Sequence, residues 1–137
     1  MALLKRGDSE STASGSTTKA VQAISQIVFE TAVQMHITHL QAVQKSYEIH
    51  KALDIFYLEL AELNDELVEK SVSVTGLLMG YSNMNIVNNL EPVGYIKQKM
   101  TDIETHRRSI AEPYIQALVD DVIQEYGHAL YRLENLK

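Results

Sequence analysis

A histidine and three carboxylates follow one another at helical spacing near the middle of the chain. His50 and Asp54 are four residues apart, Asp65 lies eleven residues further on, and Glu69 follows it by four. Steps of three or four residues place side chains on one face of an α-helix. Imidazole and carboxylate groups are ligands that proteins use for iron, manganese and zinc. The pattern therefore predicts a metal site along one edge of a helix.

The distance between these residues decides how such a site could form. His50 and Asp65 are fifteen residues apart, which is ~22 Å along a helix, so the two side chains of one chain cannot bind the same ion. Two copies of the helix, packed antiparallel about a two-fold axis near residue 58, would bring His50 and Asp54 of one copy opposite Asp65 and Glu69 of the other. The spacing thus predicts a homo-oligomer with a metal site shared between subunits.

The elements that position these residues must be helices. Residues 19–75 include neither Gly nor Pro, and apolar residues recur among them at steps of three and four. One helix over this whole stretch would be ~85 Å long, so we expect a break near residues 41–46. Ser46 is the expected N-cap of the second helix, and Ser16 or Thr17 that of the first.

Two further helices complete the expected fold. Gly76 and Gly80 end the second helix, and residues 76–91 are rich in turn formers, with room for a short helical piece. Pro92 suits the first position of a third helix, and Pro113 marks the start of a fourth. Four helices with a substantial connection between the second and the third predict an all-α protein, a four-helix bundle.

Composition narrows the classes of function. The 137 residues include no cysteine, which excludes disulfides, cysteine-based zinc sites, iron–sulfur clusters and thiol nucleophiles. A formal net charge of −6 argues against a body that wraps nucleic acid. No apolar run approaches the ~20 residues of a membrane span, and the N-terminus has no apolar stretch long enough for a secretory signal. We therefore expect a cytoplasmic protein without a membrane partner.

Residues 1–18 form a separate zone of composition. The part from residue 7 onward is rich in Ser and Thr, and only Ala13 in it is apolar. We expect a flexible arm over residues 1–18 and one helical domain over residues 19–137. Counted through residue 19, three basic residues oppose two acidic ones, so the arm carries +1 and the remainder −7. Such an arm is at most a weak DNA-binding element.

The segment from His50 to Glu69 resembles the mini-ferritins of the Dps type, and more closely a phage-encoded branch of ferritin-like proteins. The family pattern is a His, an acid four residues on, a Tyr or other aromatic seven on, an Asp fifteen on, and a Glu four beyond that. The residues that match it are His50, Asp54, Tyr57, Asp65 and Glu69. The segment from Leu118 to the C-terminus also resembles the last helix of the phage branch.

This resemblance implies a ferritin-like bundle that assembles through two-fold dimers into a closed dodecameric shell. It implies mono-iron or di-iron ferroxidase sites, where peroxide or dioxygen oxidises Fe(II) for iron storage and oxidative protection, with Zn or Mn as surrogate metals. Asp65 and Glu69 would bind the iron together with His50 and Asp54 of the neighbouring subunit. A phage-encoded protein of this kind would be found in the host cytoplasm or in the virion.

The chain also departs from the family pattern at the upstream ligand. The family has a second His about twelve residues before His50, and here that position is Thr38, with His39 beside it and His36 before it. A one-residue difference in the turn would let His39 serve as the upstream ligand. The alternatives that His36 is this ligand, or that there is no upstream ligand, stay open. The Trp beside that His and the Gly in the following turn are absent. These departures favour a second interpretation, a catalytically inactive ferritin-like protein with a structural or interaction role, for instance in a virion.

Overall fold

The computed structural model describes residues 11–77 and 79–136, and within them the chain is helical without any strand. The helices are α2 (Ser11–Ala42), α3 (Tyr47–Asp54), α4 (Phe56–Thr75), α5 (Pro92–Arg107) and α6 (Pro113–Glu134). The α3 and α4 helices form one rod, because Ile55 between them keeps helical angles (φ −84°, ψ −32°) and its carbonyl accepts from the N–H of Glu59 at 2.9 Å. The described residues thus form four helical rods.

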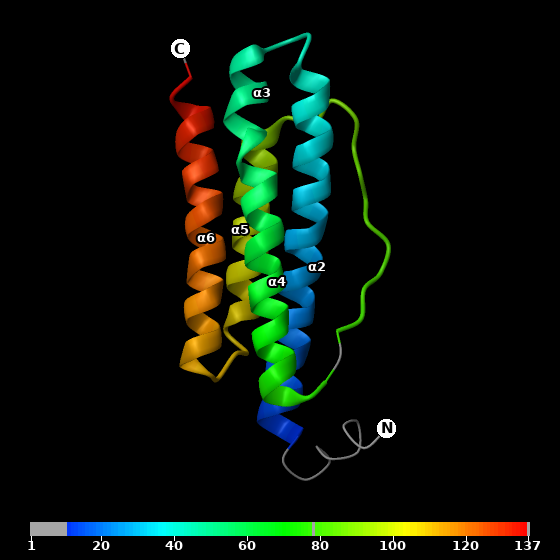
Figure 1. Cartoon of the computed structure of the whole chain (residues 1–137), viewed down its shortest axis with the longest axis vertical. Helices are drawn as coiled ribbons and strands as arrows, with labels where there is room; N and C mark the ends of the chain where they lie inside the picture. Colours follow the sequence, from blue (N-terminus) through cyan, green and yellow to red (C-terminus); the bar gives the residue numbers. More distant parts are fainter. Residues whose placement is uncertain (1–10, 78, 137) are drawn as a thin grey trace.

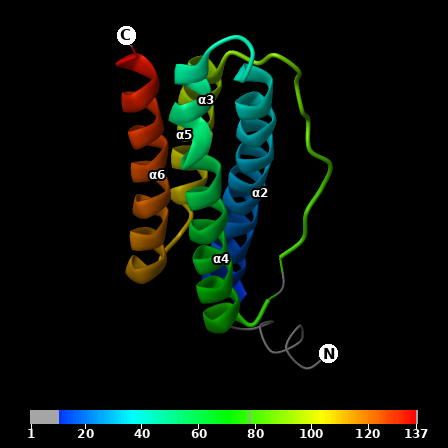
Figure 2. The same cartoon turned by 45° about the horizontal axis from the view of Figure 1, so that its top comes forward.

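The four rods pack side by side as a bundle (Figures 1 and 2). The α2 helix contacts both α4 and α5, and α6 contacts the same two helices. In Figure 1, α2 and α6 run upward while α4 and α5 run downward. The connection between α4 and α5 therefore travels back along the whole length of the bundle, which makes these two helices parallel.

The helix ends follow the local signals in the sequence. Ser46 caps α3 by accepting from the N–H of Ile49 at 3.2 Å, as expected. Gly76 ends α4 in the left-handed conformation (φ 72°) that favours glycine. Pro92 and Pro113 stand at the starts of α5 and α6, where the missing N–H of proline costs no hydrogen bond.

The start of α2 corrects one expectation. The helix begins at Ser11, so residues 11–18 are helical and not part of a flexible arm, and the first ten residues of the expected arm lie outside the described part of the chain. Ser16 and Thr17 lie inside the helix and therefore do not cap it. The Thr17 hydroxyl donates to the Glu112 carboxylate at 2.6 Å, and the Ser16 hydroxyl donates to the Ser109 carbonyl at 3.2 Å. These contacts attach a Ser- and Thr-rich segment to the end of the bundle.

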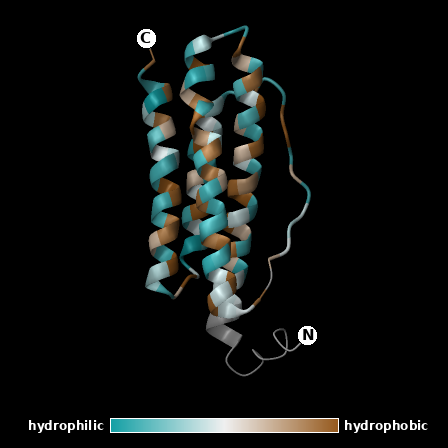
Figure 3. Ribbon diagram, in the orientation of Figure 1, coloured by the Kyte–Doolittle hydropathy of each residue, from teal (hydrophilic) through white to brown (hydrophobic). Residues whose placement is uncertain are grey.

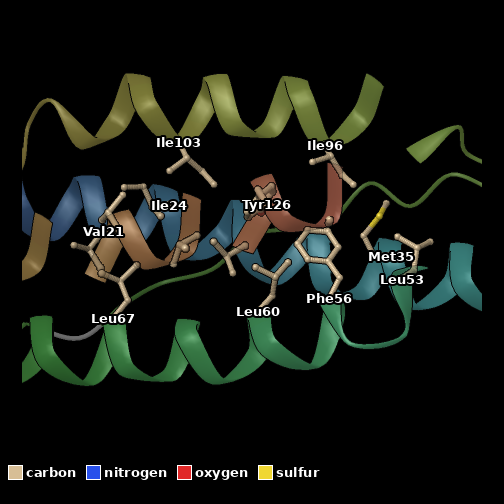
Figure 4. Packing of buried hydrophobic residues seen from close by; sticks show 14 of the residues in the cluster. Val21, Ile24, Met35, Leu53, Phe56, Leu60, Leu67, Ile96, Ile103 and Tyr126 are labelled. Carbon is tan, nitrogen blue, oxygen red and sulfur yellow. The ribbon is translucent and has the colours of Figure 1, made fainter. Parts of the chain in front are cut away.

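The hydrophobic core lies between the rods and draws on all of them (Figure 4). The apolar stripe expected in the second helical stretch points inward, with Leu53, Phe56, Leu60 and Leu67 fully buried. The side chains that meet them from the other helices include Val21, Ile24, Met35, Ile96, Ile103 and Tyr126. Hydrophobic residues also recur on the outside of the helices and along the connection between α4 and α5 (Figure 3).

That connection, residues 79–90, is called the strap here. It runs extended beside α2, and its described residues include no helical piece, for which the sequence had left room. Side-chain oxygens of α2 accept its backbone N–H groups at 2.7–3.0 Å. The pairs are Gln22 with Gly80, Gln26 with Ser82, Glu30 with Asn85, Gln34 with Val87, and Gln41 with Asn89.

The register of this ladder has a geometric origin. Four residues of an α-helix rise ~6 Å, and two residues of an extended chain span ~6.6 Å. A glutamine or glutamate at every fourth helical position can therefore meet about every second N–H of an extended segment. The ladder departs from this register twice, with a step of three residues from Ser82 to Asn85 and a step of seven from Gln34 to Gln41. No helix in the described part of the chain is long and apolar enough to cross a membrane.

Candidate metal centre

His39 and His50 form a stacked pair at the hairpin between α2 and α3. Their ring centroids are 3.8 Å apart and their planes differ by 17°. The Nδ1 atom of His39 lies 2.7 Å from the carbonyl oxygen of His50, and the Nδ1 atom of His50 lies 2.9 Å from the carbonyl oxygen of His39. A carbonyl can only accept, so each Nδ1 carries a proton and donates it. In the neutral rings, both Nε2 atoms keep a lone pair that can bind a metal.

The pair is held in place by a tight turn. The α2 helix ends at Ala42, whose carbonyl accepts from the N–H groups of Lys45 at 3.0 Å and Ser46 at 2.8 Å. This turn sets the last turn of α2, which includes His39, beside the first turn of α3, which includes His50. The His39 side chain is buried, with 8% of its surface exposed. Its orientation is thus fixed by packing as well as by its hydrogen bond.

Asp54 stands beside the open nitrogen of His39. Its Oδ1 atom lies 3.9 Å from His39 Nε2, too far for a hydrogen bond. Two ligands of one ion, each bound at about 2.0–2.2 Å, are separated by less than about 4.4 Å. The other oxygen of Asp54 lies 4.0 Å from the ammonium of Lys51. The arrangement suits a shared cation, although Lys51 provides Asp54 with an alternative partner.

A second stack flanks the pair. The His36 ring lies on the Tyr57 ring at 4.2 Å with planes 7° apart, and its centroid is 6.2 Å from that of His39. His39 is therefore the upstream histidine that contacts His50, while His36 packs against Tyr57. Thr38, at the position of the upstream His in the mini-ferritin pattern, is buried and accepts a hydrogen bond from Gln34 at 3.0 Å.

The two later carboxylates lie elsewhere on the same rod. Asp65 and Glu69 are exposed on α4, and fifteen helical residues separate Asp65 from His50 by ~22 Å. Within the described residues, no three His, Asp or Glu side chains of one chain are placed to hold a metal ion. One chain thus brings His39, His50 and Asp54 near one another without forming a three-ligand site, and it leaves Asp65 and Glu69 apart from them.

Asp65 borders an apolar depression between α2 and α4. The depression has a volume of about 110 Å³, and its wall includes Phe29 and Ala32 of α2 and Ala61 of α4. Phe29 is 47% exposed, and Leu58, one turn before Ala61, is 58% exposed. We call this surface the α2–α4 face. Large apolar side chains at such exposure mark a surface suited to contact with another protein.

Sequence reasoning missed the α2 side chains that bind the strap and the stack of His36 on Tyr57. The signal for the first was the recurrence of Gln or Glu at residues 22, 26, 30 and 34, a step of four. The signal for the second was the position of His36 one turn before His39. Neither signal indicates a partner until the strap and α3 are placed.

Two tyrosines in the interior are shifted from their ordinary acidity. Burial, followed by the nearby charge of Glu30, raises the pKa of Tyr95 to about 12. Burial also raises the pKa of Tyr126, whose hydroxyl donates to Thr31 at 2.8 Å. Both phenols stay neutral at ordinary pH. Tyr126 contributes packing and a hydrogen bond to the middle of the bundle, whereas the Tyr95 hydroxyl has no hydrogen-bond partner among the described residues.

Comparison with known proteins gives one match. Neither a curated protein nor a solved structure matches the chain. A family of unknown function, DUF5856, matches residues 39–133, a span that begins at His39 and includes α3 to α6 almost completely. The match covers well over half of the sequence, and the chain belongs to the DUF5856 family of unknown function.

Proposed function

We propose that this protein is a Dps-like mini-ferritin that binds and oxidises Fe(II) at sites shared between subunits of a homo-oligomer. The observation that carries the proposal is the His39–His50 pair, in which both Nδ1 atoms donate to backbone carbonyls beside the Asp54 carboxylate. Metal-binding histidines are commonly oriented in this way, with one ring nitrogen bonded to a carbonyl and the other left for the metal.

The course of the chain supports the ferritin-like part of the proposal. Ferritin-like bundles have one long crossover connection, and here the strap crosses the length of the bundle between the parallel helices α4 and α5. The described residues of the crossover, 79–90, are extended chain without a short helical piece.

The α2–α4 face supports the shared site. A two-fold axis near residue 58 would place the exposed Leu58 side chains of two copies against each other and cover the depression beside Ala61. The same axis would bring Asp65 and Glu69 of one copy to His39, His50 and Asp54 of the other. Each dimer would then have two complete sites, and further contacts would extend it to a closed shell.

The residues have distinct parts in the proposed chemistry. The carboxylates Asp54, Asp65 and Glu69 are hard oxygen ligands that suit iron, and the imidazoles of His39 and His50 complete the set. Each Fe(II) substrate gives up one electron to peroxide or dioxygen and leaves as Fe(III). The net charge of −6 favours accumulation of the cationic product.

Two substitutions on α4 test the proposal. Asp65→Ala and Glu69→Ala should each abolish Fe(II) oxidation, followed by absorbance, because each removes an oxygen ligand from both sites of a dimer. The native mass should not change, since both side chains are exposed. His128→Ala, on α6 and distant in sequence from the site, is the matched control. Unchanged oxidation in both α4 variants would remove the proposal.

A second candidate function is assembly without metal chemistry. The exposed apolar residues of the α2–α4 face favour it, since such a face can join subunits whether or not iron binds, and Lys51 beside Asp54 offers a plain ion pair. Purified protein of high native mass that neither retains nor oxidises iron would establish this structural role. DNA binding through the arm is the weakest candidate, and a mobility shift with and without residues 1–10, the part of the expected arm that precedes α2, tests it.

A further inference from the structure

The strap has one backbone edge bonded to α2 and one edge that faces outward. Asn85 and Val87 donate their N–H groups to Glu30 and Gln34, and the carbonyl of Val87 accepts from Gln34 at 2.9 Å. In an extended chain the N–H and C=O of one residue point to the same side, and those of the next residue point to the opposite side. Met84 and Ile86 therefore direct their backbone groups away from α2. Within the described residues, their N–H groups have no protein acceptor.

This outward edge lacks the features with which proteins protect an open strand. Charged residues and prolines commonly block such edges, yet the sequence holds neither between Lys70 and Glu91. The strap also exposes apolar side chains, with Met84 at 41% and Val87 at 42%. An extended, neutral and partly apolar edge is a template for a second extended backbone.

We propose that the strap is an interface between copies of this chain, formed when two straps pair antiparallel about a two-fold axis through Asn85. In this register, the N–H of Met84 in one copy donates to the carbonyl of Ile86 in the other, and the N–H of Ile86 donates to the carbonyl of Met84. Asn85 faces its own counterpart at the axis. Each strap keeps its bonds to its own α2.

Two arguments identify the occupant as a second copy. The first is closure: each strap already has α2 on its inner edge, so pairing the two outer edges leaves no edge open and ends the assembly. The second is charge: the chain carries −6 overall, and the strap is a strip without charge where two such acidic copies meet with least repulsion. The strap adjoins the α2–α4 face, because the Tyr81 ring meets the Phe29 ring edge-on at a centroid distance of 6.0 Å. The outward backbone edge at Met84 and Ile86 includes none of the residues that define that face, and the pairing does not depend on metal chemistry.

Charge pairs placed on the edge test the interface in the full-length protein. In the proposed register, residue 84 of one copy lies opposite residue 86 of the other. Met84→Lys with Ile86→Lys sets like charges against each other twice and should weaken self-association by about tenfold or more, measured by sedimentation equilibrium. Met84→Lys with Ile86→Glu sets opposite charges together at both places and should restore association. Asp121→Lys, an exposed position on α6, makes the same change in net charge and should leave the association constant near that of the wild type.

Amide exchange gives a second measurement at the same residues. The N–H groups of Met84 and Ile86 should become protected as protein concentration rises, while that of Val87 should be protected at every concentration because Gln34 binds it. Exchange at Met84 and Ile86 that is independent of concentration, or self-association of the double lysine variant equal to that of the wild type, would overturn the interface. The interface would also be overturned if Leu58→Lys abolished association and the double lysine variant left association intact. That outcome would leave the proposed function standing.

Discussion

The two stacked histidines illustrate what residue types can and cannot reveal. The spacing of His50, Asp54, Asp65 and Glu69 is visible in the sequence and predicts one helical edge. The choice between His36 and His39 as the upstream ligand is not visible in the sequence, because it depends on the length and closure of the turn after α2. The structure brings His39 against His50 and His36 against Tyr57. A difference of three residues along α2 thus separates a candidate ligand from a packing residue.

Substitution of the two histidines in parallel tests this distinction. His39→Ala removes the Nε2 atom beside Asp54 and the hydrogen bond to His50, so the affinity for Co(II) or Zn(II), followed by calorimetry, should fall by about 10- to 100-fold. His36→Ala is the matched control, one helical turn away, and should bind nearly as the wild type does. Equal loss in both variants would show that the aromatic stack, and not the His39 nitrogen, governs binding.

Buried tyrosines predict how stability depends on alkaline pH. Burial raises the pKa of Tyr126 above its ordinary value of 10.0 and that of Tyr95 to about 12. Above pH 10 the unfolded chain therefore loses protons that the folded protein keeps, and the free energy of unfolding falls as the pH rises. Tyr126→Phe should cost about 1 kcal/mol at pH 7 by losing the hydrogen bond to Thr31, and it should make the alkaline decline shallower. Denaturant unfolding from pH 8 to 11.5 measures both effects; an unchanged slope would contradict the second.

At the scale of elements, local signals predicted the helix ends well and the attachments of irregular segments poorly. Ser46, Gly76 and Pro92 act at single positions through their own backbone or side-chain chemistry, so the sequence alone is sufficient. The strap depends instead on four glutamines and one glutamate of α2, which lie 48 to 58 residues away in the sequence. The start of α2 likewise depends on partners near the far end of α5, which a Ser- and Thr-rich composition does not indicate.

Gln34 is the position at which the attachment of the strap can be tested. It is fully buried, and its amide accepts from the N–H of Val87 and donates to the carbonyl of the same residue. Gln34→Ala should therefore lower the free energy of unfolding by about 1–3 kcal/mol and speed amide exchange at Asn85 and Val87, with the helical amides unchanged. Gln98→Ala on α5, which loses only an exposed bond to Asp102, should change neither quantity. Slow exchange at Val87 in the Gln34 variant would mean that other contacts hold the strap.

At the scale of the whole molecule, the sequence predicted an all-helical bundle because periodicity and breakers act within each segment. The direction of the third helix was beyond that reasoning, since the connection of sixteen residues, 76–91, could turn back locally or cross the bundle. The candidate site has the same limit. One chain supplies the stacked pair of His39 and His50, with Asp54 3.9 Å from His39, while the position of Asp65 beside them requires a second copy. Only an experiment that mixes subunits can address that requirement.

Complementation between two inactive variants makes the shared site a quantitative prediction. A His50→Ala subunit retains Asp65 and Glu69, and an Asp65→Ala subunit retains His39, His50 and Asp54, so a mixed dimer regains one intact site of its two. With random pairing, half of the dimers are mixed, and co-expression should restore about a quarter of the wild-type rate of Fe(II) oxidation. Co-expression of His39→Ala with His50→Ala should restore nothing, because both lesions lie in the same half of the site. If the pair with complementary lesions also stays inactive in dimers shown to be mixed, the ligands do not meet across a two-fold axis, and the iron chemistry proposed for this fold has no complete site.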